Sequence, residues 1–181
     1  MAVTDAAAPS PVRLDPWSPE CLPLLRAVNA PEMTEHLGGP ETEEQVVRRH
    51  QRYLAMLDGP AEAGRMFRIV VVPDGVPAGT IGFWPHTGDG EDVYEIGWSI
   101  LPGFQGRGVA TAAARAVVEL ARAAGAYRYL HAYPSVRNAA SNAVCRKAGF
   151  ELRGERLFEY PVGHLMVSND WRYDLRGRGE A

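Results

Sequence analysis

The chain has 181 residues, of which 46% are hydrophobic and 23% charged, and its formal net charge is −3 at pH 7. This length fits one domain with a sizeable core, and the composition is that of a globular protein, not a disordered or fibrous one. The slightly acidic balance, with basic residues scattered along the chain, argues against a nucleic-acid-binding protein, which normally carries a basic surface stripe.

Two cysteines, Cys21 and Cys145, are too few for a disulfide framework and lie in no metal-ligand spacing. We therefore expect no structural metal and a reducing compartment. No apolar run approaches the ~20 residues of a membrane span, and the N-terminus lacks the features of a signal peptide. These features predict a cytoplasmic protein without a membrane partner. We expect one domain over residues 12–175, with loose tails at 1–11 and 176–181.

The first third of the chain predicts one strand and two helices. Residues 12–15 are a candidate strand, and the apolar residues between 19 and 29 favour a short helix. Residues 31–40 contain a Gly-Gly pair and are expected to form a loop. A Thr-Glu-Glu-Gln capping box at Thr42 begins the second helix, which Gly59 and the following proline end.

The middle of the chain predicts three strands and the longest apolar helix. Residues 66–72 and 76–84 form a hairpin around a Pro-Asp-Gly turn. Residues 85–90 are expected to be a loop and 92–101 the third strand. The helix over 109–124 has an apolar face made of Val109, Ala113, Val117, Leu120 and Ala124.

The last third predicts a strand over 127–133, then a helix over 139–148, then two or three short strands ending at 175. Asn138 caps that helix and Gly149 ends it. Most connections are hairpins, and only the passage from residue 92 to 133 is a strand–helix–strand crossover. The order therefore implies one parallel pair in a mostly antiparallel sheet.

A glycine-rich segment from Pro102 to Gly108 lies between a predicted strand and a predicted helix. The first N–H groups of a helix have no intrahelical partner and lie at the positive end of its dipole, so they stabilise an anion such as phosphate. The Rossmann fingerprint is incomplete, because Thr111 stands where its third small residue belongs, and the P-loop ending is absent. On the glycines alone, a tight turn without a ligand is the simpler interpretation.

Two longer motifs change that interpretation. The string from Gln105 to Ala110, Gln-Gly-Arg-Gly-Val-Ala, resembles the acetyl-CoA motif Q/R-x-x-G-x-G/A of the GNAT N-acetyltransferases. The segment from Asn138 to Phe150 is similar to the family's later motif, and it matches at Asn138, Ser141, Lys147, Gly149 and Phe150. The resemblance runs from about Leu14 to Leu175 and is strongest towards the ribosomal-protein-alanine acetyltransferase-like branch.

The resemblance implies an α+β GNAT fold. Its sheet would be mixed and mostly antiparallel, with six to seven strands and about four helices, and splayed at the central parallel pair. It also implies an N-acetyltransferase that moves an acetyl group from acetyl-CoA to a primary amine of a small molecule or a protein N-terminus, and it makes a homodimer plausible. The residues that it assigns to acetyl-CoA are Trp98, Ser99, Ile100, Gln105, Gly106, Arg107, Gly108, Val109, Ala110, Asn138 and Ser141.

Acetyl transfer requires a neutral amine, and a primary ammonium has a pKa of about 10.4, so a base must remove a proton. Strand alternation puts Glu95 on one face with Gly97 and Ser99, and burial there would raise its pKa into a useful range. Acidic residues at this place serve as the base in several family members, which makes Glu95 the leading candidate. A salt-bridged or solvent-facing Glu95 is an equal alternative, and His131 is the second candidate.

Cys145 departs from the family pattern, since many members carry a tyrosine there that protonates the departing CoA thiolate. A thiol, with a reference pKa of about 8.5, is a possible catalytic replacement, but a small buried packing residue is the favoured interpretation. Ser141 and Tyr133 are other candidate acids, and the thiolate can also leave to solvent. The alternative function is a catalytically inactive acyl-CoA-binding sensor or partner module.

Overall fold

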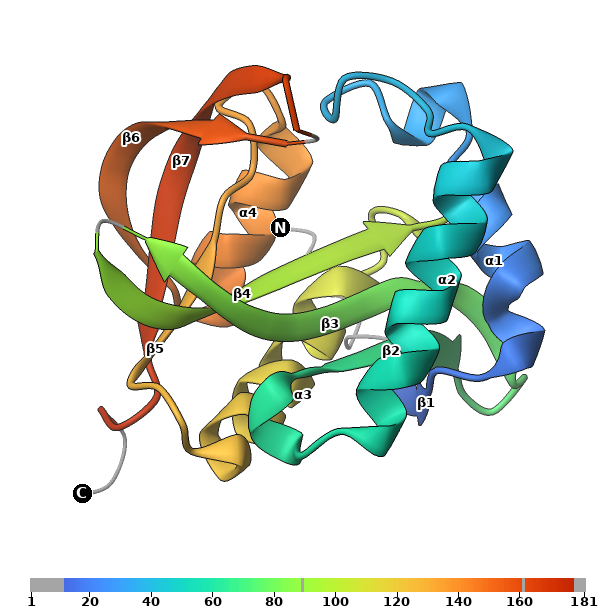
Figure 1. Ribbon diagram of the computed structural model, residues 1–181, viewed down its shortest axis with the longest axis horizontal. Helices are drawn as coiled ribbons and strands as arrows, with labels where there is room; N and C mark the ends of the chain where they lie inside the picture. Colours follow the sequence, from blue (N-terminus) through green and yellow to red (C-terminus); the bar gives the residue numbers. More distant parts are fainter. Residues whose placement is uncertain (1–11, 89, 161, 178–181) are drawn as a thin grey trace, which may run out of the picture.

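The computed structural model describes residues 12–88, 90–160 and 162–177, which form a seven-stranded sheet flanked by helices (Figure 1). Its strand order is β1-β2-β3-β4-β5-β7-β6, and only β4 and β5 are parallel neighbours. The expected mixed, mostly antiparallel sheet is therefore confirmed. The strands are β1 (Val12–Pro16), β2 (Arg65–Val71), β3 (Val76–Gly88), β4 (Glu91–Ile100), β5 (Tyr129–Ala132), β6 (Glu151–Glu159) and β7 (Leu165–Asp174).

Four α-helices lie among the described residues: α1 (Leu22–Ala27), α2 (Glu43–Asp58), α3 (Val109–Ala124) and α4 (Ala139–Ala148). The bounds of α3 and α4 agree with the sequence expectation, and so does the capping box at Thr42, whose side chain accepts from the backbone N–H of Gln45. Residues 1–11 and 178–181, which make up most of the two expected tails, lie outside the described residues. None of the described helices combines the length and the hydropathy that crossing a bilayer requires.

The two faces of the sheet carry separate apolar clusters. Helices α3 and α4 cover one face, where the buried residues include Ile81, Tyr94, Val117 and Leu130. Helices α1 and α2 cover the other face over β2 and β3, in the right half of Figure 1, while the β6–β7 hairpin rises on the left. Because α1 and α2 cover only that half, the same face of β5, β7 and β6 carries no helix from the described part of the chain.

One sequence expectation was wrong at the end of β3. Residues 85–90 were expected to be a loop, yet β3 continues to Gly88 and pairs with β4 from Gly79 to Gly88. Pro85 is tolerated because β2 stops pairing at Phe83, so the missing N–H of the proline faces a side where no strand lies. The side chain of Thr87 donates a hydrogen bond of 2.8 Å to Asp92 across the extended hairpin.

Smaller corrections concern α3 and the last strands. Leu120 was expected on the buried face of α3 but is 39% exposed, because the buried stripe also takes in Ala114, Val118 and Ala121. The expected strand over 127–133 shortens to β5, and the two or three short strands after Phe150 are two long ones, β6 and β7. The long β6–β7 hairpin forms the end of the sheet and rises on the left of Figure 1, beside the face that no helix covers there.

Candidate active site

The parallel pair at the centre of the sheet is very short. β4 and β5 pair only at Tyr94 with Leu130 and at Glu95 with His131, although β4 continues to Ile100. Within the described residues, no strand pairs with that edge of β4 after Glu95. The peptide groups of Trp98, Ser99 and Ile100 therefore belong to a strand with one open edge, which an extended ligand with amide groups could pair with.

The glycine-rich loop follows this open edge directly. Gly106 and Gly108 have φ angles of 72° and 77°, the left-handed region that glycine adopts without strain, and Gly108 is the residue before α3. No side chain caps the start of α3, whereas α2 and α4 are capped by Thr42 and Asn138. The first N–H groups of α3, at Val109 and Ala110, can therefore bind an anion.

Two other residues of the loop have local partners. The side-chain amide of Gln105 donates a hydrogen bond of 2.9 Å to the carbonyl of Ile100, which fixes the loop against the end of β4. Arg107 is exposed, with its guanidinium 5.9 Å from the ring centre of Phe104. Gln105 thus shapes the candidate phosphate site, and Arg107 is the side chain in the loop that can add a positive charge.

Helix α4 begins at a side-chain cap and buries Cys145. The side chain of Asn138 accepts a hydrogen bond of 3.0 Å from the backbone N–H of Ser141, so it caps the helix. Cys145 is fully buried among the apolar residues under α3 and α4, and this burial raises the pKa of its thiol to about 12. The structure thus places Ser141 near the start of α4 and Cys145 inside the core.

Asn142, which sequence reasoning missed, fixes α4 to β7. It is 7% exposed, and its amide nitrogen donates to the carbonyls of Ser135 and Asn138 at 2.9 and 2.8 Å. Its oxygen accepts from Asn169 and from the indole of Trp171, at 2.7 and 2.8 Å. These four hydrogen bonds, two of them buried and two part-buried, hold the first turn of α4 in register with the sheet.

A row of side chains crosses the sheet on the face that carries α1 and α2. The strand registers pair Trp84 with Glu95, Glu95 with His131, and His131 with Arg172. The residues before and after Glu95 and His131 belong to the apolar cluster under α3 and α4, so Glu95 and His131 point the opposite way. The two leading candidate bases are therefore neighbours, at the last pair before β4 and β5 separate.

Glu95 is a largely buried carboxyl group. Its side chain is 15% exposed, and burial raises the pKa of the carboxyl to about 7, partly offset by a hydrogen bond from Trp84. The Trp84 ring lies over Gly97, where a Cβ atom would be only 2.8 Å from the ring, so glycine leaves room for the indole. A carboxyl group with a pKa near 7 can accept a proton at neutral pH, which is what a general base requires.

His86 lies next to Glu95, although the sequence placed it in a loop and assigned it no role. Its Nδ1 atom is 3.3 Å from Oε2 of Glu95, and its side chain is 27% exposed. The imidazole ring also contacts the rings of Tyr133 and Phe158, at centroid distances of 5.4 and 6.0 Å. Burial lowers the pKa of His86, and the positive charge of Arg156 lowers it further.

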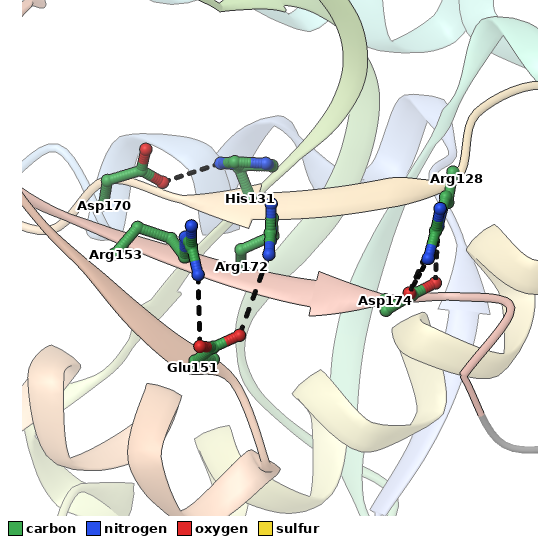
Figure 2. Close-up of polar contacts among 7 residues, drawn as sticks. All are labelled: Arg128, His131, Glu151, Arg153, Asp170, Arg172 and Asp174. Carbon is green, nitrogen blue, oxygen red and sulfur yellow. Dashed lines mark hydrogen bonds and ion pairs between the residues drawn. The ribbon is translucent and has the colours of Figure 1, made fainter.

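His131, whose ring contacts that of Tyr133, forms a close pair with Asp170 of β7 (Figure 2). The His131 Nδ1 and Asp170 Oδ1 atoms are 2.6 Å apart, and both side chains are largely buried. Arg156 lies 3.6 Å from the other Asp170 oxygen. A solvent-open pocket of about 350 Å³ adjoins this pair and is lined in part by Gly88, Val93, His131, Tyr133, Arg156 and Asp170.

The structure brings together a buried carboxyl group, a histidine beside it, an open strand edge and an uncapped helix start. Sequence reasoning proposed Glu95, His131 and the glycine loop. It expected Trp84 near the acceptor pocket but not beside Glu95, left His86 in a loop without a role, and missed Asp170. Alternation along β3 would have placed Trp84 and His86 on the face of Glu95 if the strand had been extended past Pro85. Asp170 gave no such signal, because its approach to His131 depends on the pairing of β5 with β7.

The sequence matches a known protein family. The family model described as acetyltransferase (GNAT) domain matches residues 12–151, which is most of the chain. No curated protein matches the sequence.

Solved structures share the fold at low sequence identity. An acetyltransferase from Agrobacterium tumefaciens is 24% identical, with a TM-score of 0.71, and the match covers 96% of this chain and 98% of that one. A Salmonella typhimurium acetyltransferase that modifies the N-terminal serine of ribosomal protein L7/L12 is 20% identical, with a TM-score of 0.71 and coverages of 92% and 96%. AAC(6')-Ib in complex with paromomycin and acetyl-CoA is 22% identical, with a TM-score of 0.69 and coverages of 94% and 99%.

Proposed function

The chain belongs to the GNAT acetyltransferase family, and from this premise we propose that it transfers the acetyl group of acetyl-CoA to a primary amine by direct attack. The observation that carries the proposal is the position of Glu95. This buried carboxyl, with its pKa raised to about 7, lies where β4 and β5 separate, on the strand that leads into the glycine loop. A base, a strand edge for the cofactor and a phosphate site thus follow one another along one segment.

The cofactor would bind along that segment. The first N–H groups of α3, with Gly106 and Gly108 leaving the backbone accessible, would hold the pyrophosphate. The open edge of β4 from Trp98 to Ile100 would pair with the amide groups of the pantetheine arm. A backbone N–H at this edge would also stabilise the oxyanion that develops on the thioester carbonyl.

Glu95 would then prepare the acceptor. Its carboxylate takes a proton from the ammonium group, and the neutral amine attacks the thioester carbonyl. The new C–N bond forms, the C–S bond breaks, and the CoA thiolate takes up a proton from the attacking nitrogen or from solvent. The acceptor of the Salmonella relative is an N-terminal serine and that of AAC(6')-Ib is an aminoglycoside, which supports an amine as the acceptor.

Incubating the protein with acetyl-CoA and a panel of amines tests the proposal through the release of free CoA thiol. The panel contains peptides with free N-termini, aminoglycosides and polyamines, and the control is a peptide whose N-terminus is blocked. We expect CoA release with at least one amine and none with the blocked peptide. Binding of acetyl-CoA without turnover for any amine would favour the alternative of an inactive acyl-CoA-binding module.

Cys145 is expected to contribute little to catalysis. Its thiol is fully buried in the apolar cluster, and the raised pKa keeps it protonated at neutral pH. Cys145→Ala should therefore keep kcat/KM within about threefold, with a stability cost of about 1 kcal/mol for the small cavity. A fall of 100-fold or more, at unchanged acetyl-CoA affinity, would show instead that this thiol protonates the leaving group.

We further propose that the protein works in the cytoplasm. The two cysteines, Cys21 and Cys145, are free and buried, which agrees with a reducing compartment. A homodimer remains a proposal that rests on the family alone.

A further inference from the structure

The proposed reaction releases one proton in each turnover. Acetyl-CoA and an ammonium ion give an amide, the free thiol of CoA and a proton, and Glu95 is the group that first receives this proton. Its side chain is only 15% exposed, and a bound acceptor would cover it further. Since a base must lose its proton before the next turnover, a second group should connect Glu95 to water.

His86 is placed to make that connection. It lies on β3 beside Val93 of β4, on the same face of the sheet as Glu95, with Nδ1 3.3 Å from the carboxyl oxygen. With 27% of its side chain exposed, the imidazole is in contact with solvent as well as with Glu95. Its neighbours Gly88 and Tyr133 line the solvent-open pocket, so the ring lies close to space that solvent can enter.

The charged and titratable groups around His86 favour rapid release of a proton. They come from every strand packed against it: Glu95 on β4, His131 on β5, Tyr133 after β5, Arg156 on β6 and Asp170 on β7. Burial, Arg156 and His131 lower the pKa of His86, while Asp170 raises it. The net effect is a lowered pKa, because burial, Arg156 and His131 together outweigh Asp170. An imidazolium formed at His86 therefore loses its proton readily.

We propose that His86 carries the proton from Glu95 to water, an inference that rests on the proposed function. The O–H bond of the Glu95 carboxylic acid breaks and an N–H bond forms at Nδ1, which leaves the carboxylate and an imidazolium. The imidazolium then gives its Nε2 proton to water. Rotation of the ring lets the remaining Nδ1 proton exchange with solvent, and the ring returns with Nδ1 free before the next turnover. His86 is thus a proton carrier in the reaction and not only a support for the carboxylate.

Chemical rescue tests this role. In dilute buffer, His86→Ala should lower kcat about tenfold or more, and added imidazole at tens of millimolar should restore most of the rate. The wild-type kcat should not depend on buffer concentration. A His86→Ala enzyme with the wild-type rate in dilute buffer, or one that imidazole does not rescue, would overturn the proposal.

His86→Asn is the matched control for a purely structural role. The amide of asparagine occupies the place of Nδ1 and can hold the Glu95 carboxylate, but it cannot carry a proton. We expect this variant to be as slow as His86→Ala and to be rescued less by imidazole, because the amide fills part of the space that imidazole would enter. Full activity in His86→Asn would show that His86 only positions Glu95.

Two measurements separate this proposal from the proposed function. If wild type transfers no acetyl group to any amine, the proposed function fails. If wild type is active, a Glu95→Gln/His86→Ala double variant should be no slower than Glu95→Gln alone and should show no imidazole rescue. NMR titration of the His86 ring adds a readout without substrate: Glu95→Gln should lower the pKa of His86, and an unchanged value would contradict the coupling of the two groups.

Discussion

Glu95→Gln should lower kcat/KM for the acceptor amine by about 100-fold to 10,000-fold, the range that a positioned general base contributes. In wild type the carboxylate is the active form, so kcat/KM should rise with pH through about 7, the raised pKa of Glu95, and then level off. The variant should lack this inflection. A pH–rate profile of the two proteins measures both effects, because glutamine keeps the shape of the side chain and removes only its ability to accept a proton.

The same substitution should stabilise the protein above pH 7. The pKa of Glu95 rises from 4.5 to about 7 on folding, so its contribution to stability is present below pH 4.5 and is lost as the pH rises to about 7. At pH 8 the free energy of unfolding of Glu95→Gln should exceed that of wild type by about 3 kcal/mol, as measured by urea unfolding.

Glu44→Gln is a suitable control for both measurements, since Glu44 is an exposed residue on α2 paired with Arg48. It should leave the pH–rate profile and the stability unchanged. A Glu95→Gln enzyme with the wild-type rate would exclude Glu95 as the base and leave His131, its neighbour across the parallel pair, as the candidate.

Gly108→Glu should weaken acetyl-CoA binding by about 100-fold or more. The new carboxylate would stand at the start of α3, where the pyrophosphate is expected, and would repel it. The substitution also places a side chain at a φ of 77°, which costs about 1–2 kcal/mol of backbone strain. Calorimetric titration of acetyl-CoA into wild type and variant measures the loss.

Gly75→Glu controls for the strain and for the added charge. Gly75 lies in the turn between β2 and β3 with a φ of 70°, and a Cβ atom there meets nothing within 4 Å. The Gly75→Glu substitution should destabilise the protein about as much as Gly108→Glu and leave the affinity for acetyl-CoA unchanged. Equal losses of affinity in the two variants would mean that strain, not the phosphate site, explains the result.

Local signals in the sequence were sufficient for the helices. Thr42 and Asn138 each supply an oxygen that caps a helix, and Gly125 and Gly149 end α3 and α4 in the left-handed conformation. Because caps and glycine stops act within a few residues, the bounds of α3 and α4 could be predicted.

The candidate site was harder to predict because it is assembled from several strands. Pro85 looked like the end of a strand, so His86 was assigned to a loop, although the proline is tolerated where β2 no longer pairs. The pair of His131 with Asp170 joins residues far apart in the chain through the β5–β7 pairing. Such approaches depend on sheet register, which a single sequence does not specify.

The short parallel ladder has a mechanical consequence. Strands β1 to β4 and strands β5, β7 and β6 form two blocks of one sheet. Among the described residues, strand pairing joins the two blocks at only two positions, Tyr94 with Leu130 and Glu95 with His131. A rotation of one block against the other would break few hydrogen bonds, so this seam is the natural axis for breathing motions. A cofactor lying along it would act as an extra strand, and its departure after each turnover would loosen the sheet beside Glu95 and His131.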